Sequence, residues 1–221
     1  MAETFIVVWE GVDGAGKTTL MKRVKSLLAE KGYKVLTYKT PSDSSTGKFA
    51  KTYGNDPRID PLTRMLLFLA NTSDDSKIMK KLMEERPDYL FIDRYYLCSI
   101  VYGLAFLNLS GITVSAEEFT NLIGLIEKLG NNVFLKPHLY VIVDAPEEDR
   151  IKRLSRKESQ GGLENALERD ILMQQRVRRF YKVFRDRRPD HVLWVMNPEG
   201  KLEQTAEEVA GYLISESKKL R

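Results

Sequence analysis

Short apolar runs alternate with segments of helical periodicity along the chain, starting at the N-terminus. Residues 5–9 form a continuous apolar run, which is typical of a strand buried on both faces. The next segment ends at Gly32, a residue type that favours helix termination. It carries apolar residues at helical spacing, namely Leu20, Val24, Leu27 and Leu28. The pattern therefore predicts a strand, a loop and a helix, in that order.

The same alternation continues to the end of the chain. Four further strands are predicted, at residues 33–39, 89–92, 139–143 and 191–196. Helical patterns cover residues 95–107, 116–129 and 203–220. Strands that are buried on both faces and separated by helices indicate a parallel sheet, so the predicted fold class is α/β. No repeat or linker divides the sequence, and we expect a single domain over residues 1–221.

Pro61 begins another predicted helix, because proline is favoured in the first turn. The periodicity predicts a stripe that faces the core, made of Leu62, Met65, Leu66 and Leu69. A second line of residues, at spacing i, i+4 and i+8, lies beside this stripe and is able to face a cleft: Arg64, Phe68 and Thr72.

A polar segment at residues 155–168 contains Gly161-Gly162 and lies between two predicted helices. These features predict a mobile flap, or lid, and the alternative is an ordinary surface loop. Two arginines, Arg153 and Arg156, lie at its start.

Composition narrows the class of protein further. The chain has 221 residues, of which 43% are hydrophobic and 30% charged, as in ordinary globular proteins. Its single cysteine, Cys98, excludes a framework of internal disulfides. We expect a cytoplasmic location and no membrane partner, because the sequence shows neither a membrane span nor a signal peptide. The net charge of +4 is accompanied by no nucleic-acid-binding motif, so we expect no nucleic-acid partner.

The loop after the first predicted strand carries a phosphate-binding motif. Residues 11–18 read GVDGAGKT and match the pattern GxxxxGK[ST] between a strand and a helix. Glycines let backbone N–H groups converge on phosphate oxygens, and the following helix adds the positive end of its dipole. We expect Lys17 to contact the β- and γ-phosphates of ATP and Thr18 to bind Mg²⁺. The predicted phosphate-binding residues are Gly11, Gly14, Ala15, Gly16, Lys17, Thr18 and Thr19.

A second candidate anchor is the triplet Asp93-Arg94-Tyr95, where the third predicted strand ends. Ligands of open parallel sheets bind outside the carboxyl ends of the strands, so this triplet is expected near the phosphates. There Asp93 can hold Mg²⁺ or its waters, and Arg94 can neutralise charge that accumulates during phosphoryl transfer.

Together these features resemble the thymidylate kinase family of P-loop nucleoside monophosphate kinases. Three segments carry the resemblance: residues 11–19 (GVDGAGKTT), 66–71 (LLFLAN) and 93–103 (DRYYLCSIVYG). The resemblance covers nearly the whole chain. It implies a three-layer fold in which helices flank a five-stranded parallel sheet, with a lid over the donor. It also implies a homodimer that transfers the γ-phosphoryl of ATP to a deoxynucleoside monophosphate, with Mg²⁺ as cofactor and dTMP as the leading acceptor.

The resemblance assigns roles at the acceptor side. Asp13 would contact the sugar, and Arg94 would bind both the acceptor phosphate and the transferred group. Phe68 would stack on the base, and Tyr102 would press on the ribose 2′ position and favour deoxyribose. The implied acceptor-binding residues are Asp13, Lys39, Phe68, Thr72, Arg94, Ser99 and Tyr102.

On the donor side, some family members place an arginine in the phosphate loop where this chain has Gly14, so the lid must supply the cation. We expect Arg156 or Arg153 to reach the transferred phosphate. Arg153 also resembles the residue that stacks on adenine, and Asn197 lies in a loop that borders adenine in this family. The implied catalytic residues are Asp13, Lys17, Asp93, Arg94 and Arg156.

The chain departs from the family pattern mainly where the base is read. Thr72 and Gly103 replace an arginine and a frequent glutamine, and Lys39 replaces an arginine before Pro41. Cys98 stands at the usual serine position, with Ser99 one place later. A kinase for another nucleoside monophosphate therefore stays open as an alternative.

Other functions on the same fold agree less well with the sequence. Deoxynucleoside kinases tend to carry Glu-Arg-Ser where this chain has Asp93-Arg94-Tyr95. The guanine-reading sequence Asn-Lys-x-Asp is absent, which argues against a GTPase switch. A nucleotide-binding module without catalysis is disfavoured by the intact Lys17 and Thr18.

Overall fold

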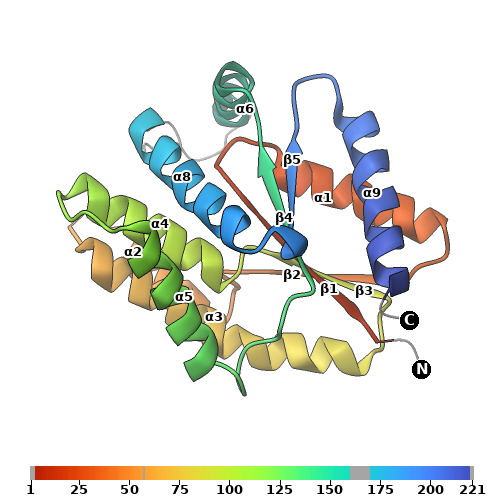
Figure 1. Ribbon diagram of the computed structural model, residues 1–221, viewed down its shortest axis with the longest axis horizontal. Helices are drawn as coiled ribbons and strands as arrows, with labels where there is room; N and C mark the ends of the chain where they lie inside the picture. The colour runs from red at the N-terminus through yellow and green to blue at the C-terminus, as the bar shows by residue number, and fades with distance from the viewer. Residues whose placement is uncertain (1–2, 57, 160–169, 220–221) are drawn as a thin grey trace.

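The computed structural model describes residues 3–56, 58–159 and 170–219, and its centre is one parallel sheet (Figure 1). The sheet has five strands in the order β2-β3-β1-β4-β5. Their bounds are β1 Phe5–Gly11, β2 Val35–Lys39, β3 Tyr89–Asp93, β4 Leu139–Asp144 and β5 Val192–Met196. Every residue of β1, β3 and β4 is buried, which is why these segments are continuous apolar runs. The predicted five-stranded parallel α/β fold is confirmed.

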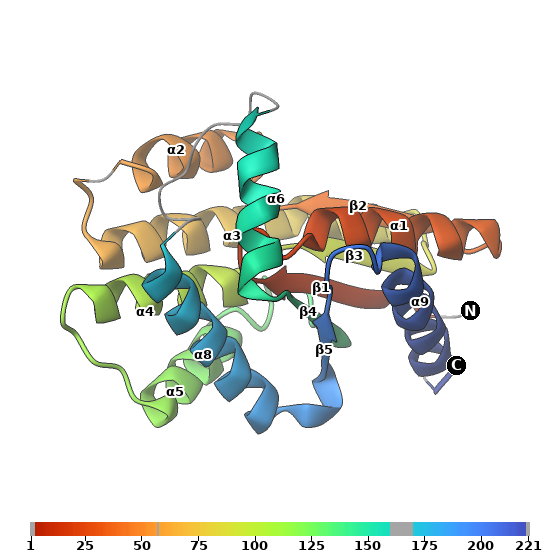
Figure 2. The same cartoon turned by 90° about the horizontal axis from the view of Figure 1, so that it is seen from above.

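Helices cover both faces of the sheet (Figures 1 and 2). On one side α1 (Lys17–Glu30) packs against α9 (Leu202–Lys219). The other side carries α3 (Pro61–Glu84), α4 (Tyr96–Leu109), α5 (Ala116–Leu129) and α8 (Ile171–Arg187). A short 3₁₀ helix, Pro189–His191, leads into β5, and α2 (Ser45–Gly54) packs on α3. Helix α6 (Glu147–Ser159) follows β4 and stands at the carboxyl edge of the sheet (Figure 2).

The register of the sheet determines which loops meet at the carboxyl edge. Trp9 of β1 and Lys39 of β2 both pair with Asp93 of β3. On the other side of β1, Gly11 pairs with Val143 of β4. The phosphate loop, Lys39 and the Asp93-Arg94 turn therefore leave the sheet side by side.

The predicted core stripe of the helix beginning at Pro61 is half wrong. Met65 and Leu69 are buried, but Leu62 and Leu66 are 48% and 53% exposed. Helix α3 packs between α2 and α4, so its buried face is set by these neighbours and continues through polar positions. The buried polar residues of α3 are Asn71, Thr72, Asp75 and Ser76.

Two other segments differ from the expectation. The apolar pattern predicts no helix over Ser45–Gly54, yet α2 forms there, and its N-cap Ser44 accepts a hydrogen bond from the Gly47 amide. Residues 155–159 of the expected lid continue α6, and residues 160–168 lie outside the described residues.

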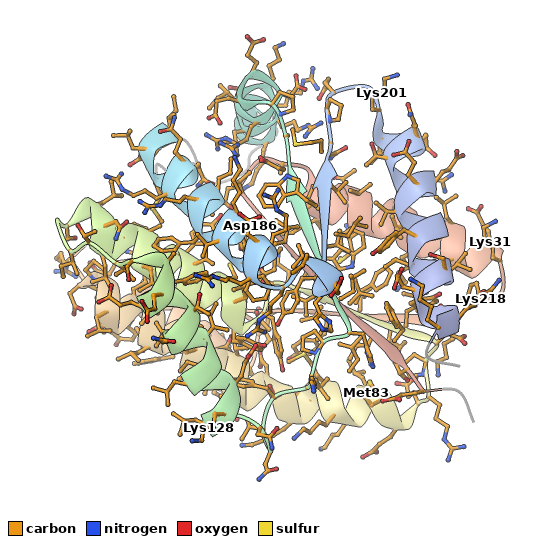
Figure 3. The ribbon with its side chains drawn as sticks, in the orientation of Figure 1. Lys31, Met83, Lys128, Asp186, Lys201 and Lys218 are labelled. Atoms are coloured by element: carbon orange, nitrogen blue, oxygen red, sulfur yellow. The ribbon has the colours of Figure 1, made fainter. Side chains whose placement is uncertain are left out.

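Charged side chains lie around the rim of the molecule. Lys31 and Lys218 lie on the α1 and α9 side, and Lys128 lies across the view on α5 (Figure 3). All three are exposed, so the positive charge is spread over several elements. Among the helices of the described residues, none combines the length and the hydrophobicity that crossing a bilayer requires.

The close approach of β1 to β4 gives a testable requirement for glycine at position 11. Gly11 has φ +137°, and a Cβ there would lie 2.0 Å from the carbonyl oxygen of Val143. We predict that Gly11→Ala lowers the free energy of unfolding by about 3 kcal/mol, because backbone strain and overlap add together. Gly32 also has positive φ, but nothing lies within 4 Å of its Cβ position. As the control, Gly32→Ala should cost about 1 kcal/mol in urea unfolding; equal losses for the two variants would contradict this account.

Candidate functional site

The phosphate loop lies between β1 and α1 and forms one wall of a cavity of about 660 Å³. Gly14 and Gly16 adopt positive φ values of 80° and 79°, and Gly16 is the N-cap of α1. These conformations are accessible to glycine and bend the chain so that the backbone faces the cavity. Helix α1 begins at Lys17, so its N-terminus points at the same space, as an anion site requires.

Lys17, Thr18 and Asp93 meet at the floor of this cavity. Lys17 Nζ lies 3.1 Å from Asp93 Oδ1, and the Thr18 hydroxyl donates to Asp93 Oδ2 at 3.1 Å. Burial lowers the pKa of Lys17, and the neighbouring Arg94 charge adds to this effect while Asp93 opposes it. Burial acts to raise the pKa of Asp93, but the charges of Lys17 and Arg94 bring it below its ordinary value. The carboxylate is therefore ionised at neutral pH beside a hydroxyl oxygen.

Arg94 and Asp13 form an ion pair across the site. Arg94 adopts φ +67°, which is uncommon for a residue with a side chain, and its amide donates to the Trp9 carbonyl oxygen at 3.0 Å. This turn directs the guanidinium back toward the phosphate loop. Burial acts to raise the pKa of Asp13, but the charges of Arg94 and Lys17 lower it. The Tyr102 hydroxyl also donates to Asp13 Oδ2, at 2.9 Å.

A second cavity, of about 780 Å³, adjoins the first. Asp13, Lys39 and Arg94 line both cavities, so they form the wall that the two share. The residues expected at the acceptor side all line this second cavity: Asp13, Lys39, Phe68, Thr72, Arg94, Ser99 and Tyr102.

Two departures from the family pattern have visible consequences in the second cavity. The Thr72 hydroxyl donates to the Phe68 carbonyl oxygen at 2.9 Å, and Thr72 is 1% exposed. A Cβ on Gly103 would lie 2.5 Å from the side chain of Met65, so Met65 occupies space beside α4 where a larger residue would project.

The residues expected near adenine lie together on the opposite side of the first cavity. Arg153 donates to the carbonyl oxygens of Ala15 and Asn197, at 3.0 and 2.9 Å, and Asn197 Nδ2 donates to Ala15 at 2.8 Å. Arg156 is exposed and forms an ion pair with Glu199, which also pairs with Arg153. In this conformation both arginines pair with Glu199 and line the first cavity, and neither lines the second.

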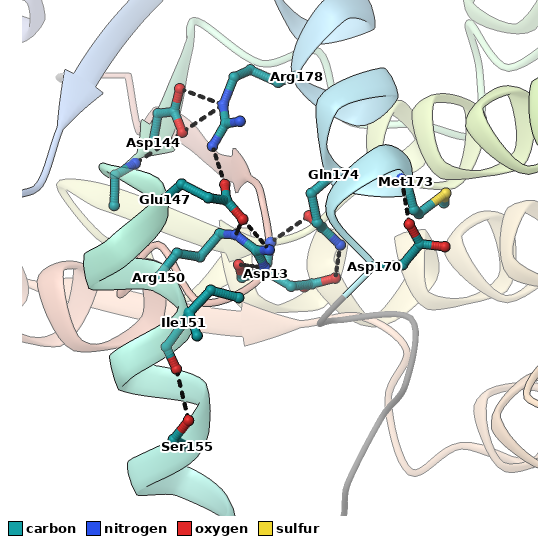
Figure 4. Close-up of polar contacts among 11 residues, drawn as sticks. Asp13, Asp144, Glu147, Arg150, Ile151, Ser155, Asp170, Met173, Gln174 and Arg178 are labelled. Carbon is teal, nitrogen blue, oxygen red and sulfur yellow. Dashed lines mark hydrogen bonds and ion pairs between the residues drawn. The ribbon is translucent and has the colours of Figure 1, made fainter.

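Sequence reasoning missed residues of α6 and α8 that bind Asp13 of the phosphate loop (Figure 4). Gln174 of α8 accepts from the Asp13 amide at 3.0 Å and donates to its carboxylate at 3.3 Å. Arg150 of α6 is fully buried, donates to the Asp13 carbonyl oxygen at 3.1 Å and bonds Glu147. The helices that precede and follow residues 160–169 thus both contact Asp13. A glutamine or arginine within a helix gives no sequence signal for such a role.

Asp144 was also missed, although a signal existed. It ends β4 at the carboxyl edge, as Asp93 ends β3, and its two carboxylate oxygens accept from Arg178 Nε at 3.0 and 2.9 Å. Arg178 also lies 3.5 Å from Glu147, so Arg178 of α8 links the end of β4 to the first turn of α6 (Figure 4).

Glu10, in β1 just before the phosphate loop, is fully buried. One carboxylate oxygen accepts from the amides of Tyr95 and Cys98, at 3.0 and 3.2 Å, in the first turn of α4. The other accepts from the Tyr181 hydroxyl of α8 at 2.9 Å. Glu10 thus fixes the turn that carries Arg94. Burial raises the pKa of Glu10 to about 7, although the charges of Arg94 and Lys17 oppose this.

Comparison with known proteins identifies relatives of the chain. A family model described as thymidylate kinase matches residues 9–209. A probable thymidylate kinase of Sulfurisphaera tokodaii is 32% identical over 165 residues, which are 73% of this chain and 74% of the relative. A thymidylate kinase of Caldicellulosiruptor saccharolyticus is 34% identical over 67% of this chain and 68% of its own. The crystal structure of thymidylate kinase from Ehrlichia chaffeensis shares the fold, with a TM-score of 0.66 and 19% identity over 96% of this chain and 99% of its own.

The buried Glu10 predicts a pH dependence of stability. Because the folded state raises its pKa from 4.5 to about 7, the stabilising contribution of the protonated carboxyl is complete below pH 4.5. It is lost as the pH rises to about 7, and the shift corresponds to about 3 kcal/mol. Relative to Glu10→Gln, the wild type should therefore lose about 3 kcal/mol of unfolding free energy between pH 4.5 and 8.

Urea unfolding at several pH values measures this difference. The matched control is Glu207→Gln, an exposed position on α9, which should keep the wild-type profile. Parallel stability curves for the wild type and Glu10→Gln would show that Glu10 does not titrate in this way.

Proposed function

The chain belongs to the thymidylate kinase family and is an ATP-dependent nucleoside monophosphate kinase, and we propose that its two adjoining cavities bind ATP and dTMP. The observation that carries this proposal is the shared wall of Asp13, Lys39 and Arg94. A phosphoryl group that moves from one nucleotide to another must pass between the two sites. The two cations of this wall can hold phosphate oxygens at the crossing point.

On the donor side, the backbone of the phosphate loop and Lys17 would hold the β- and γ-phosphates of ATP. The support is the position of Lys17 at the N-terminus of α1, where the helix dipole also favours anions. Arg153 and Asn197 would border adenine, since both contact the far side of the same loop. Arg156 would reach the transferred phosphate only after leaving Glu199, with which it pairs in this conformation.

The residues of the donor cavity also fit a magnesium ion. Mg²⁺ prefers oxygen ligands and is usually held by one or two side chains together with substrate phosphates. Thr18 and Asp93 present a hydroxyl and an ionised carboxylate next to each other, and we propose these as the protein's ligands. The ion would neutralise charge on the phosphates.

At the acceptor side, Asp13 would hold the sugar and Arg94 the acceptor phosphate. Both groups are already fixed: Asp13 by Tyr102 and Gln174, and Arg94 by its turn. Such preorganisation favours transfer, because little of the binding energy is lost in ordering the site. Phe68 would stack on the base, and Tyr102 would lie against the sugar, since both line this cavity beyond the shared wall.

We also propose that residues 1–221 form one kinase domain that acts on free nucleotides in the cytoplasm, and not on nucleic acid or membranes. The cavity volumes of about 660 and 780 Å³ support single nucleotides as ligands. A homodimer is part of the proposal. Leu62 and Leu66 support it, because they form an exposed apolar pair one turn apart on α3.

The decisive test of function is an ADP-release assay with dTMP, dUMP, dCMP and thymidine as acceptors. We predict turnover of dTMP by the wild type and a loss of about 100-fold or more in Lys17→Ala, because a cation that stabilises transferring phosphate is removed. Lys22→Ala, at an exposed position of the same helix, is the control and should stay within about 3-fold of the wild type. Absence of turnover with every monophosphate would refute the proposal, and turnover of thymidine alone would support a deoxynucleoside kinase.

The dimer has its own test. We predict that the double variant Leu62→Glu and Leu66→Glu changes the mass measured by light scattering from dimer to monomer, because charges would be buried in the interface. Leu125→Glu changes a leucine of similar exposure, 52%, on α5, and should leave the dimer intact. A monomeric wild type would rule out the homodimer, and a dimeric double variant would place the interface elsewhere.

A further inference from the structure

The second cavity has two ends that differ in their chemistry. At one end lies the shared wall, with Arg94 just before the first turn of α4. At the other lie Phe106 of α4 and Arg64 of α3. Because a helix rises 1.5 Å per residue, Phe106 lies about 15 Å along α4 from Tyr96. If the acceptor phosphate lies at Arg94, as proposed above, the base of the acceptor extends toward the end at Phe106.

Arg64 brings a positive charge to this end of the cavity. Its guanidinium carbon lies 4.5 Å from the centre of the Phe106 ring, and its Nη2 donates to the Asp56 carbonyl oxygen at 3.2 Å. The Asp56 carboxylate bonds Arg58 instead, at 2.6 Å. Within residues 3–56, 58–159 and 170–219, no carboxylate lies within ion-pair distance of Arg64. A guanidinium has five N–H donors, so Arg64 keeps donors for a ligand.

The other cations around the cavity are engaged differently. Arg94 pairs with Asp13, and Lys51 pairs with Asp43 at 2.7 Å. Lys39 belongs to the shared wall. Thr72 faces the same cavity, but its hydroxyl is bonded within its own helix. Of the side chains described around the cavity, Arg64 is thus the cation placed to donate at the base end.

We propose that Arg64 is a specificity-determining residue that donates hydrogen bonds to the 4-oxo group of a thymine or uracil base. The proposal rests on the kinase function proposed above and names how its acceptor is selected. Thymine presents a carbonyl oxygen at this position, whereas cytosine presents an amino group. A guanidinium only donates, so it bonds the carbonyl and leaves the amino group facing another donor. Phe68, one helical turn along the same face of α3, stands ready to stack on the ring.

The test compares dTMP with dCMP as acceptors for the wild type and Arg64→Met. Methionine keeps the unbranched stem but offers no donor. We expect kcat/KM for dTMP to fall by about 10- to 100-fold and that for dCMP to change by less than about 3-fold, so the preference collapses. Arg64→Lys should restore part of the preference, because its ammonium still donates. Lys77→Met, an exposed and equivalent change on α3, should alter neither value.

The results for dTMP and dCMP separate the role of Arg64 from the proposed function. An equal loss for dTMP and dCMP, or no loss at all, would overturn the role of Arg64 in reading the base. A wild type that does not phosphorylate dTMP would instead overturn the proposed function. If Arg64→Met proves unstable, the ratio of the melting-temperature rises with dTMP and with dCMP is measured in Arg64→Lys instead, and it should fall below the wild-type ratio because an ammonium lacks the planar fork of donors. An unchanged ratio of the two shifts would then also overturn the proposal.

Discussion

The parallel pairing of β1 with β3 is the constraint on which the rest of the site depends. Trp9 lies opposite Asp93, and the amide of Arg94 donates to the Trp9 carbonyl oxygen. The phosphate loop and the Arg94 turn therefore leave the sheet next to each other, although more than eighty positions separate Asp13 from Arg94 in the chain. A shift of one residue in this register would turn every side chain of the strand to the opposite face and separate the pair.

The charges at this edge are balanced by fixed partners. Burial, together with the nearby charge of Arg94, lowers the pKa of Lys17, and two neighbouring cations are costly to bury without carboxylates. Asp93 pairs with Lys17, Asp13 pairs with Arg94, and Glu10 supports the turn from below. Asp13 is in turn held by α6, which bonds its carbonyl oxygen, and by α8, which bonds its carboxylate, so the helices on both sides of residues 160–169 contact the same residue. The site is thus organised by tertiary contacts as much as by its motifs.

The sequence predicted those parts of the site whose positions follow from a short continuous segment or from the end of a strand. The phosphate loop is a continuous motif between a strand and a helix, and Asp93-Arg94 lies where a parallel sheet concentrates its ligands. The structure brings these residues together. Glu10, Arg150 and Gln174 could not be predicted, because their roles arise from neighbours far along the chain.

Helix α3 shows the same limit in the fold. Its periodicity is correct, but Leu62 and Leu66 are exposed because packing against α2 and α4 chooses a different face. The buried polar face, which includes Asn71 and Asp75, has no apolar signal. Hydrophobic pattern therefore located the helix correctly and misjudged which of its sides is buried.

The most direct test is a crystal structure with a bisubstrate analogue, in which adenosine and thymidine are joined through their 5′ positions by a chain of phosphates. We expect adenine beside Arg153 and Asn197, thymine between Phe68 and Arg64, and the connecting phosphates between Lys17, Lys39 and Arg94. A bound analogue whose phosphates avoid the wall of Asp13, Lys39 and Arg94 would contradict the claim that transfer takes place there.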